Sequence, residues 1–297
     1  MGDPMRHPGD APVRQRAEAL VASCSIEISP RDDLADDGLG ELFHPGTTVF
    51  VNHPGSVTHH DIVRACVRLR RAGFNPVPHI AARRLISFTQ ASDFVQRAAH
   101  EAGVTDALVI GGDPERAMGP FPDAHDLLAS GLLARNALRA VLFAGYPEGH
   151  PRIAARVLDE ALWAKLALAR QQGLEASVVT QFSFDAAPIL HWLAKLKAGD
   201  IASPVRVGIA GHATVATLAK FAVRCGIGAS LRALARGHTA FARILAEAGP
   251  DALIEALAAG EDPRWPIDGL HIFTFGGVRR TAEWISGYLH FKTSAAR

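Results

Sequence analysis

The sequence is poor in cysteine, and the three cysteines that it has are far apart. Cys24, Cys66 and Cys225 form no CxxC pair and are odd in number. Disulfide frameworks and cysteine-rich metal sites depend on regularly spaced cysteines, so the sequence argues against both. A reducing compartment, the cytoplasm, is therefore the expected location.

The sequence also lacks an excess of charge and any long apolar run. Its 31 Lys and Arg residues balance 30 Asp and Glu residues, which leaves a net charge of +1. This balance gives no general attraction to nucleic acid or to an anionic membrane. No segment reaches the roughly 18 to 20 apolar residues of a membrane span, and the first residues contain no apolar core of a signal peptide. We expect neither export nor membrane insertion, and a flexible leader over residues 1–17.

What the sequence does contain is a regular alternation of short β-branched runs and longer alanine-rich segments of helical period. Strands are predicted at Ser25–Ile28, Thr48–Asn52, Pro76–Ile80, Ala107–Ile110, Ala140–Phe143, Ser177–Gln181, Val205–Ile209 and His271–Phe275. Helices are predicted at His60–Ala72, Ala91–Ala102, Ala124–Ala134, Ile153–Gln172, Ala187–Lys197, Ala213–Val223 and Ala282–Leu289, with an extra pair at Ser230–Ala235 and Thr239–Ala259. Strands that alternate with crossover helices favour a single-domain (β/α)8 barrel, a TIM barrel, over residues 18–297. A doubly wound open sheet is the competing arrangement.

Polar residues stand at or just beyond the ends of several predicted strands. They are Glu27, Asn52, His79, Asp113 and Gln181. In a parallel barrel the carboxyl ends of the strands share one rim, where the active sites of such barrels are assembled. These side chains are therefore expected to converge.

Glu27 is an acidic residue within the otherwise apolar strand SIEIS. A carboxylate there must reach the barrel mouth or bear a desolvation cost, and desolvation would raise its pKa toward values useful for general acid catalysis. The alternative is a salt bridge to a neighbouring arginine.

The segment VIGGDP places Gly111, Gly112 and Asp113 directly after a strand. Glycines let a ligand approach the backbone and expose amide donors. The segment is not a GxGxxG fingerprint, and a tight turn capped by Asp113 is the alternative interpretation.

The segment FAGYPEGHP leads from the fifth strand toward a long helix, with Pro151 expected near its first turn. Tyr146, Glu148 and His150 would then surround a helix N-terminus, which attracts anions. Tyr146 could stack on a flat ring, and His150 could donate to a phosphate or ribose oxygen. A rigid capped loop is the alternative.

The segment VVTQFSFD ends the sixth strand with Gln181 beside Phe182 and Phe184. A primary amide donates and accepts at once, which matches the amide and amidine edge of a pterin. The two phenylalanines are candidate ring contacts or ordinary core residues.

The adjacent histidines His59 and His60 predict no metal site. Neighbouring residues at a helix start are expected to point in different directions, and no carboxylate or cysteine stands at a ligand spacing in the sequence.

Taken together, the segments SIEIS, PHIAAR, VIGGDP, YPEGHP, VTQFSFD, VGIAG and HIFTFGGVRRT resemble the methylenetetrahydrofolate reductase family in order and approximate spacing. The resemblance implies a (β/α)8 barrel that binds FAD and reduces 5,10-methylenetetrahydrofolate to 5-methyltetrahydrofolate with electrons from NADH or NADPH. It also implies a possible homo-oligomer.

The resemblance further implies roles for single residues. Glu27 corresponds to the general acid that protonates the folate nitrogen, Asp113 to a carboxylate near the flavin and pterin, and Gln181 to an amide that contacts the pterin. Positions matching flavin contacts are Asn52, His53, His79, Ile110, Gly111, Gly112, Asp113, Tyr146 and His150, with Lys165 and Arg170 as candidates for the flavin phosphates. Arg279 or Arg280 corresponds to an arginine on the folate side.

Two alternatives stay open. One is a flavin-free enzyme in which hydride passes directly from nicotinamide to the folate. The other is a folate-binding barrel or accessory subunit without redox activity.

Overall fold

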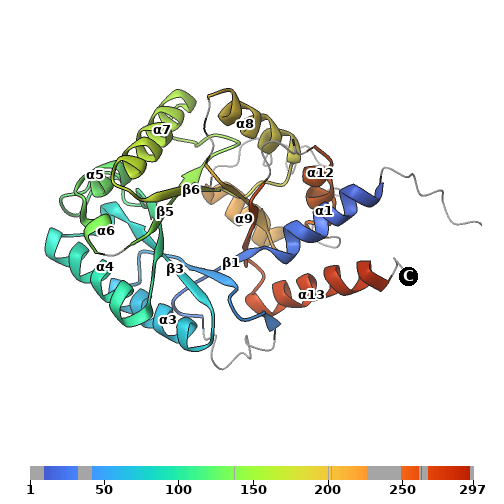
Figure 1. The fold of residues 1–297 in the computed structure, drawn as a ribbon, viewed down its shortest axis with the longest axis horizontal. Helices are drawn as coiled ribbons and strands as arrows, with labels where there is room; N and C mark the ends of the chain where they lie inside the picture. Colours follow the sequence, from blue (N-terminus) through green and yellow to red (C-terminus); the bar gives the residue numbers. More distant parts are fainter. Residues whose placement is uncertain are drawn as a thin grey trace, which may run out of the picture.

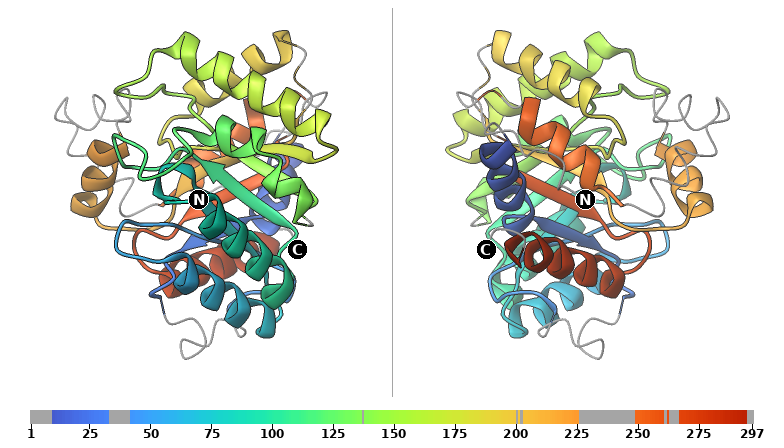
Figure 2. Two further views of the ribbon diagram at one scale, coloured as in Figure 1. Left: turned by 90° about the vertical axis from the view of Figure 1, so that its left-hand side faces the viewer. Right: turned by 90° about the vertical axis from the view of Figure 1, so that its right-hand side faces the viewer.

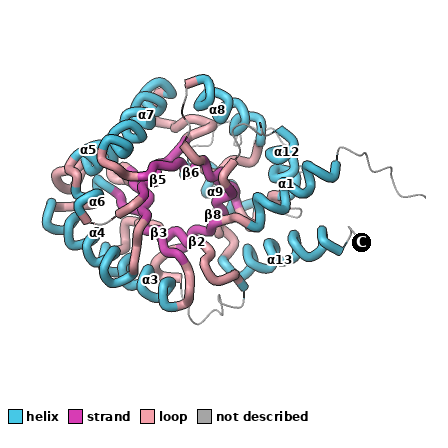
Figure 3. The backbone as a smooth tube through the Cα atoms, viewed as in Figure 1, coloured by secondary structure: helices cyan, strands magenta, loops and turns pink. Residues whose placement is uncertain are grey.

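Eight parallel strands form a closed barrel in chain order, as the sequence predicts (Figures 1 and 3). The computed structural model describes residues 10–32, 42–136, 138–199, 201, 203–225, 249–260, 262 and 267–294. The strands are β1 (Ser25–Ile28), β2 (Thr48–Val51), β3 (Asn75–Ala81), β4 (Asp106–Ile110), β5 (Ala140–Gly145), β6 (Glu175–Thr180), β7 (Val205–Ala210) and β8 (Gly269–Phe273). Direct pairing of Ile26 in β1 with Ile272 in β8 closes the barrel and excludes the open sheet.

Helices surround the barrel on its outer face, except α9, which lies across one end of the barrel (Figures 2 and 3). They are α1 (Asp10–Ala22), α3 (His59–Arg71), α4 (Phe88–Ala102), α5 (Ala124–Ala129), α6 (Leu132–Arg135), α7 (Ala155–Gln171), α8 (Ala186–Ala198), α9 (Val215–Cys225), α12 (Asp251–Gly260) and α13 (Val278–Ser294), with a 3-10 turn at Ala82–Arg84. In the part of the chain that the structure describes, none of these helices has the length and apolar character needed to cross a bilayer.

Two expectations about helices need correction. The expected leader over residues 1–17 is helical from Asp10 onward, because Ala17, Leu20 and Val21 are spaced to bury one face. This helix, α1, packs beside α12 and α13 (Figure 2).

The predicted helix Ala124–Ala134 is divided into α5 and α6. Gly131 has a left-handed φ of 68°, and the Ser130 hydroxyl donates a hydrogen bond back to the carbonyl of Leu127. Both features end a helix. The predicted helix Ser230–Ala235 lies outside the described residues, as does the first part of Thr239–Ala259, whose last part forms α12.

The core has two layers, separated by the barrel wall. Side chains between the strands and the helices form the larger layer, which includes Ile26 and Ile28. Inside the barrel, one smaller cluster contains Phe50, Val77, Leu108, Leu142 and Val179, from β2 to β6. Because side chains alternate along a strand, Glu27 faces the interior while Ile26 and Ile28 face the helices. The interior therefore contains an apolar cluster from β2 to β6 and a carboxylate at β1.

Candidate active site inside the barrel

Glu27 lies at the centre of a polar group inside the barrel. Its Oε2 atom is 3.3 Å from Nε2 of His79 in β3 and 3.5 Å from Nε2 of His271 in β8. Its Oε1 atom accepts a hydrogen bond of 3.4 Å from Nδ2 of Asn52, directly after β2. Two imidazoles and an amide from three strands thus converge on one carboxylate, whose side chain is 14% exposed. The arginine salt bridge considered for Glu27 is replaced by this group.

His271 is the residue of this group that sequence reasoning missed. Its side chain is fully buried, and its Nδ1 atom is 3.0 Å from the hydroxyl of Ser25. The ring lies edge-on to Phe50, with centroids 4.5 Å apart. Like the glutamate in SIEIS, this histidine interrupts an otherwise apolar strand, GLHIF. The same pattern could therefore have indicated His271 as a site residue.

The electrostatics around Glu27 differ from the expectation. Burial raises the pKa of Glu27, but the positive charge of His79 and the contacts with His271 and Asn52 outweigh it, so the pKa lies below the ordinary value. Burial lowers the pKa of His79, the charge of Glu27 opposes that shift, and the net direction is downward. The carboxylate is therefore ionised in the ligand-free protein, and the expectation that desolvation alone sets a raised pKa is wrong.

Several polar atoms of this group are buried without a well-formed hydrogen bond among the described residues. They are Nε2 of His79, Nε2 of His271 and Oδ1 of Asn52. Buried polar atoms without partners are costly, and they are common where a ligand supplies the missing partner. These atoms make the interior next to Glu27 a candidate position for a ligand.

An aromatic cluster borders the polar group on the side of β6 to β8. The cluster consists of Phe182, Phe184, Phe221, Phe273 and Phe275. Phe273 pairs in register with Glu27 and lies edge-on to His271 at 4.8 Å. Phe182 and Phe184 are buried, as the core interpretation predicts, whereas Phe273 and Phe275 are half-buried and present aromatic surface that the sequence analysis did not single out.

The amide of Gln181 follows β6 and is half-buried beside this cluster. Its Oε1 atom accepts a hydrogen bond of 3.2 Å from the backbone N–H of Phe182. This contact leaves the amide nitrogen as the group that Gln181 can offer to a ligand.

The segment after β4 forms a turn, with Gly112 at a left-handed φ of 91°. Ile110 packs against the interior cluster, and the exposed carboxylate of Asp113 lies 3.8 Å from the guanidinium of Arg84.

Close to Arg84, the Nδ1 atom of His53 accepts a hydrogen bond of 3.4 Å from the N–H of Ala81. Burial and the nearby charges of Arg84, His79 and His59 lower the pKa of His53 to about 4.

The loop after β5 holds Tyr146 and His150 together, with ring centroids 5.5 Å apart and edge-on. Glu148 accepts a hydrogen bond of 2.6 Å from the hydroxyl of Ser183, which ties this loop to the loop after β6. The expected helix start is displaced, because α7 begins at Ala155 and Pro151 lies in a preceding turn. Tyr146 and His150 therefore belong to a structured loop and not to a helix N-terminus.

Lys165 and Arg170 are not at the barrel mouth. The ammonium of Lys165 lies 5.2 Å from the ring of Phe143, in the layer between α7 and the barrel wall, and burial lowers its pKa. Arg170 is exposed in the last turn of α7, which leads into the amino end of β6. The expectation that these two cations contact the flavin phosphates is therefore not supported by their positions.

Arg279 and Arg280 are exposed in the first turn of α13, just beyond β8.

The sequence matches no protein-family model. Among solved structures, the chain is similar to a protein from Clostridium thermocellum described as binding two copies of 5-methyl-5,6,7,8-tetrahydrofolic acid, with a TM-score of 0.57, 12% identity, and coverage of 96% of this chain and 100% of that one. It is also similar to the tetrameric deoxyribose phosphate aldolase of Aeropyrum pernix, with a TM-score of 0.50, 13% identity, and coverage of 95% and 98%. At these identities the likeness establishes the fold, and the chain is a (β/α)8 barrel.

Proposed function

We propose that this protein is an oxidoreductase that interconverts 5,10-methylenetetrahydrofolate and 5-methyltetrahydrofolate, with NADH or NADPH as the hydride donor. The observation that carries the proposal is the carboxylate of Glu27, held inside the barrel by His79, His271 and Asn52. The reaction needs a buried acid beside a flat heterocycle. The resemblance of SIEIS and VTQFSFD to the reductase family supports this substrate, as does the likeness in fold to a barrel that binds a methylated folate.

The proposed step balances as a proton and a hydride transfer. The bound folate excludes water from the ionised carboxylate, which raises the pKa of Glu27, so Glu27 takes up a proton in the complex. Glu27 gives this proton to N10 of the folate, the bond between N10 and the methylene carbon breaks, and its electron pair stays on N10. The methylene carbon and N5 then form an iminium, which accepts hydride from C4 of the dihydronicotinamide. The nicotinamide is oxidised and the one-carbon unit becomes a methyl group. Each turnover also consumes one proton, which returns to Glu27 through the adjacent imidazoles.

The aromatic cluster and Gln181 provide the contacts for the pterin. Aromatic rings stack or meet edge-to-face with flat heterocycles, and Phe273 and Phe275 are the half-buried members of the cluster. The amide nitrogen of Gln181 donates to the pterin carbonyl. Asp113, with Arg279 or Arg280, remains the proposed contact for the rest of the folate.

FAD does not fit the residues expected to hold its phosphates. Lys165 is fixed over Phe143, and Arg170 stands at the other end of α7. Asn52 and His79, two further expected flavin contacts, are engaged with Glu27. We therefore favour the flavin-free reaction, in which hydride passes directly between the two substrates.

One experiment separates the candidates. The absorption of purified protein is recorded between about 350 and 500 nm, where flavin absorbs and side chains do not, before and after FAD, NADH and methylenetetrahydrofolate are added. A colourless protein that oxidises NADH only in the presence of the folate supports direct transfer. Flavin bands that bleach with NADH and return with folate would overturn direct hydride transfer. The proposed interconversion of the two folates would then stand, with a flavin as the intermediate carrier. Folate binding without oxidation of NADH or NADPH would overturn the redox function and indicate a folate-binding barrel.

A further inference from the structure

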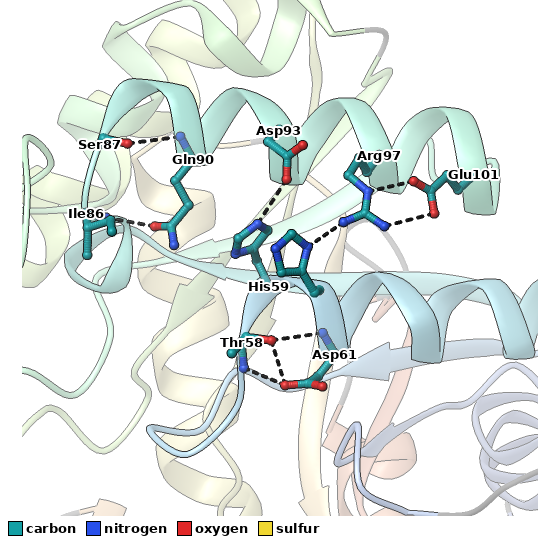
Figure 4. A network of polar contacts seen from close by, with 10 residues as sticks. Thr58, His59, Asp61, Ile86, Ser87, Gln90, Asp93, Arg97 and Glu101 are labelled. Carbon is teal, nitrogen blue, oxygen red and sulfur yellow. Dashed lines mark hydrogen bonds and ion pairs between the residues drawn. The ribbon is translucent and has the colours of Figure 1, made fainter.

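Two adjacent histidines at the start of α3 meet an aspartate of α4 on the outer side of the barrel (Figure 4). The Nε2 atom of His59 lies 3.0 Å from Oδ2 of Asp93. The rings of His59 and His60 have centroids 3.9 Å apart. One ligand atom from each of the three residues lies within 4.8 Å of the others. The expectation that the two histidines point apart is therefore wrong.

From this geometry we propose that His59, His60 and Asp93 bind one divalent transition-metal ion of the Zn²⁺ type and fasten α3 to α4. Two imidazole nitrogens and one carboxylate oxygen are a common ligand set for zinc, with water in the fourth position. Two ligand atoms about 2.1 Å from a tetrahedral zinc ion lie about 3.4 Å apart. The 3.0 Å contact between His59 and Asp93 needs only a small adjustment to reach that spacing.

His59 lies where a bound metal ion would be partly shielded from water. Its side chain is only 10% exposed. His59 also lines a cavity of about 170 Å³, which provides an entry route for an ion.

Among the described residues, Arg97 is the one cation that contacts the three ligands. It would compete with a metal ion for His60. Its guanidinium donates to Nδ1 of His60 and also binds Glu101 one turn further along α4, at 2.6 Å from Nε to Oε1 (Figure 4). A metal ion would displace Arg97 from His60, and Glu101 would keep the guanidinium paired. Removing the charge of Arg97 should therefore strengthen metal binding.

The test measures Zn²⁺ binding to the full-length, tag-free protein after treatment with a chelator. Isothermal titration calorimetry at neutral pH should give one site per chain, and Co²⁺ should give the visible absorption of a four-coordinate ion. Zinc in a hundredfold excess over its Kd should raise the melting temperature by about 4 °C. Absence of saturable binding would overturn the proposal.

Variants assign the site to its residues. His59→Ala, His60→Ala and Asp93→Asn should each weaken binding more than about tenfold, since even indirect partners of a metal are worth that much. Arg97→Gln should strengthen binding, which a variant that merely misfolds would not do. His100→Ala removes an exposed histidine of the same helix and serves as the control. Binding that survives all three ligand variants would assign the metal to another place and overturn the proposal.

Discussion

The hydroxyl of Ser25 is 3.0 Å from Nδ1 of His271, and the opposite nitrogen of the same ring faces the carboxylate of Glu27. A hydroxyl that donates to Nδ1 leaves the ring proton on Nε2, where it faces Glu27 and helps to lower the pKa of that carboxyl. Ser25 thus orients a proton toward Glu27.

Replacing Ser25 should alter the pH dependence of turnover. In Ser25→Ala the imidazole is free to carry its proton on Nδ1, so ionised Glu27 loses part of the stabilisation that the proton on Nε2 gives it. The pKa of Glu27 should then rise, and the falling limb of the pH profile of turnover should move to higher pH. Ser25→Thr keeps the hydroxyl and should retain the profile. A lower rate with an unmoved profile in Ser25→Ala would indicate a structural role only.

Glu27→Gln should lower kcat by about 10² to 10⁴, because the amide keeps the shape of the side chain but cannot supply the proton. Folate binding, measured by fluorescence quenching, should change by less than about threefold. Glu175→Gln is a matched control, since Glu175 is exposed at the first position of β6, at the opposite end of the strands. Unchanged turnover in Glu27→Gln would remove Glu27 from the acid role.

His53 should make the fold less stable in acid. Its pKa is about 4 in the folded protein against 6.5 for the free side chain, so below pH 6.5 the unfolded chain binds the additional proton. Stability is lost as pH falls from 6.5 toward 4. Between pH 7.5 and pH 5 this residue should account for about 2 kcal/mol of lost unfolding free energy. Urea unfolding of His53→Gln should show a smaller loss than the parent protein, and an equal loss would contradict the assignment.

Lys165→Met should leave turnover unchanged and leave the protein as stable or more stable. Methionine keeps an apolar stem against Phe143 and removes the desolvation of a half-buried ammonium. Thermal unfolding and steady-state rates measure both effects. A selective loss of FAD binding in this variant, with the fold intact, would restore Lys165 to a cofactor site.

Much of the fold could be predicted from the sequence, because β-branched runs and helical periods are local patterns. The ends of the strands were less accurate, since pairing sets them: β8 is Gly269–Phe273, two residues earlier than predicted, in register with β1. The break at Gly131 and the late start of α7 depend on single backbone conformations that periodicity does not reveal.

The site was predictable where a polar residue interrupts an apolar strand and unpredictable where two distant segments meet. Glu27, Asn52 and His79 were found by the first signal and do converge. The downward pKa of Glu27 depends on His79 and His271, which lie about 50 and 240 positions away, so local burial gave the wrong direction. The contact of His59 with Asp93 also joins two separate segments, α3 and α4, so the sequence did not indicate it.

The contact between Glu27 and His271 spans the seam where the first strand meets the last. Folding brings these two ends together only after the loop between them, most of the chain, has been closed, which is the slowest class of contact to form. A nascent chain therefore carries Glu27 almost from the start of synthesis and gains its contact with His271 only when β8 docks. Loss of β8 would thus leave the barrel open at this seam and remove one of the two imidazoles from the proposed acid.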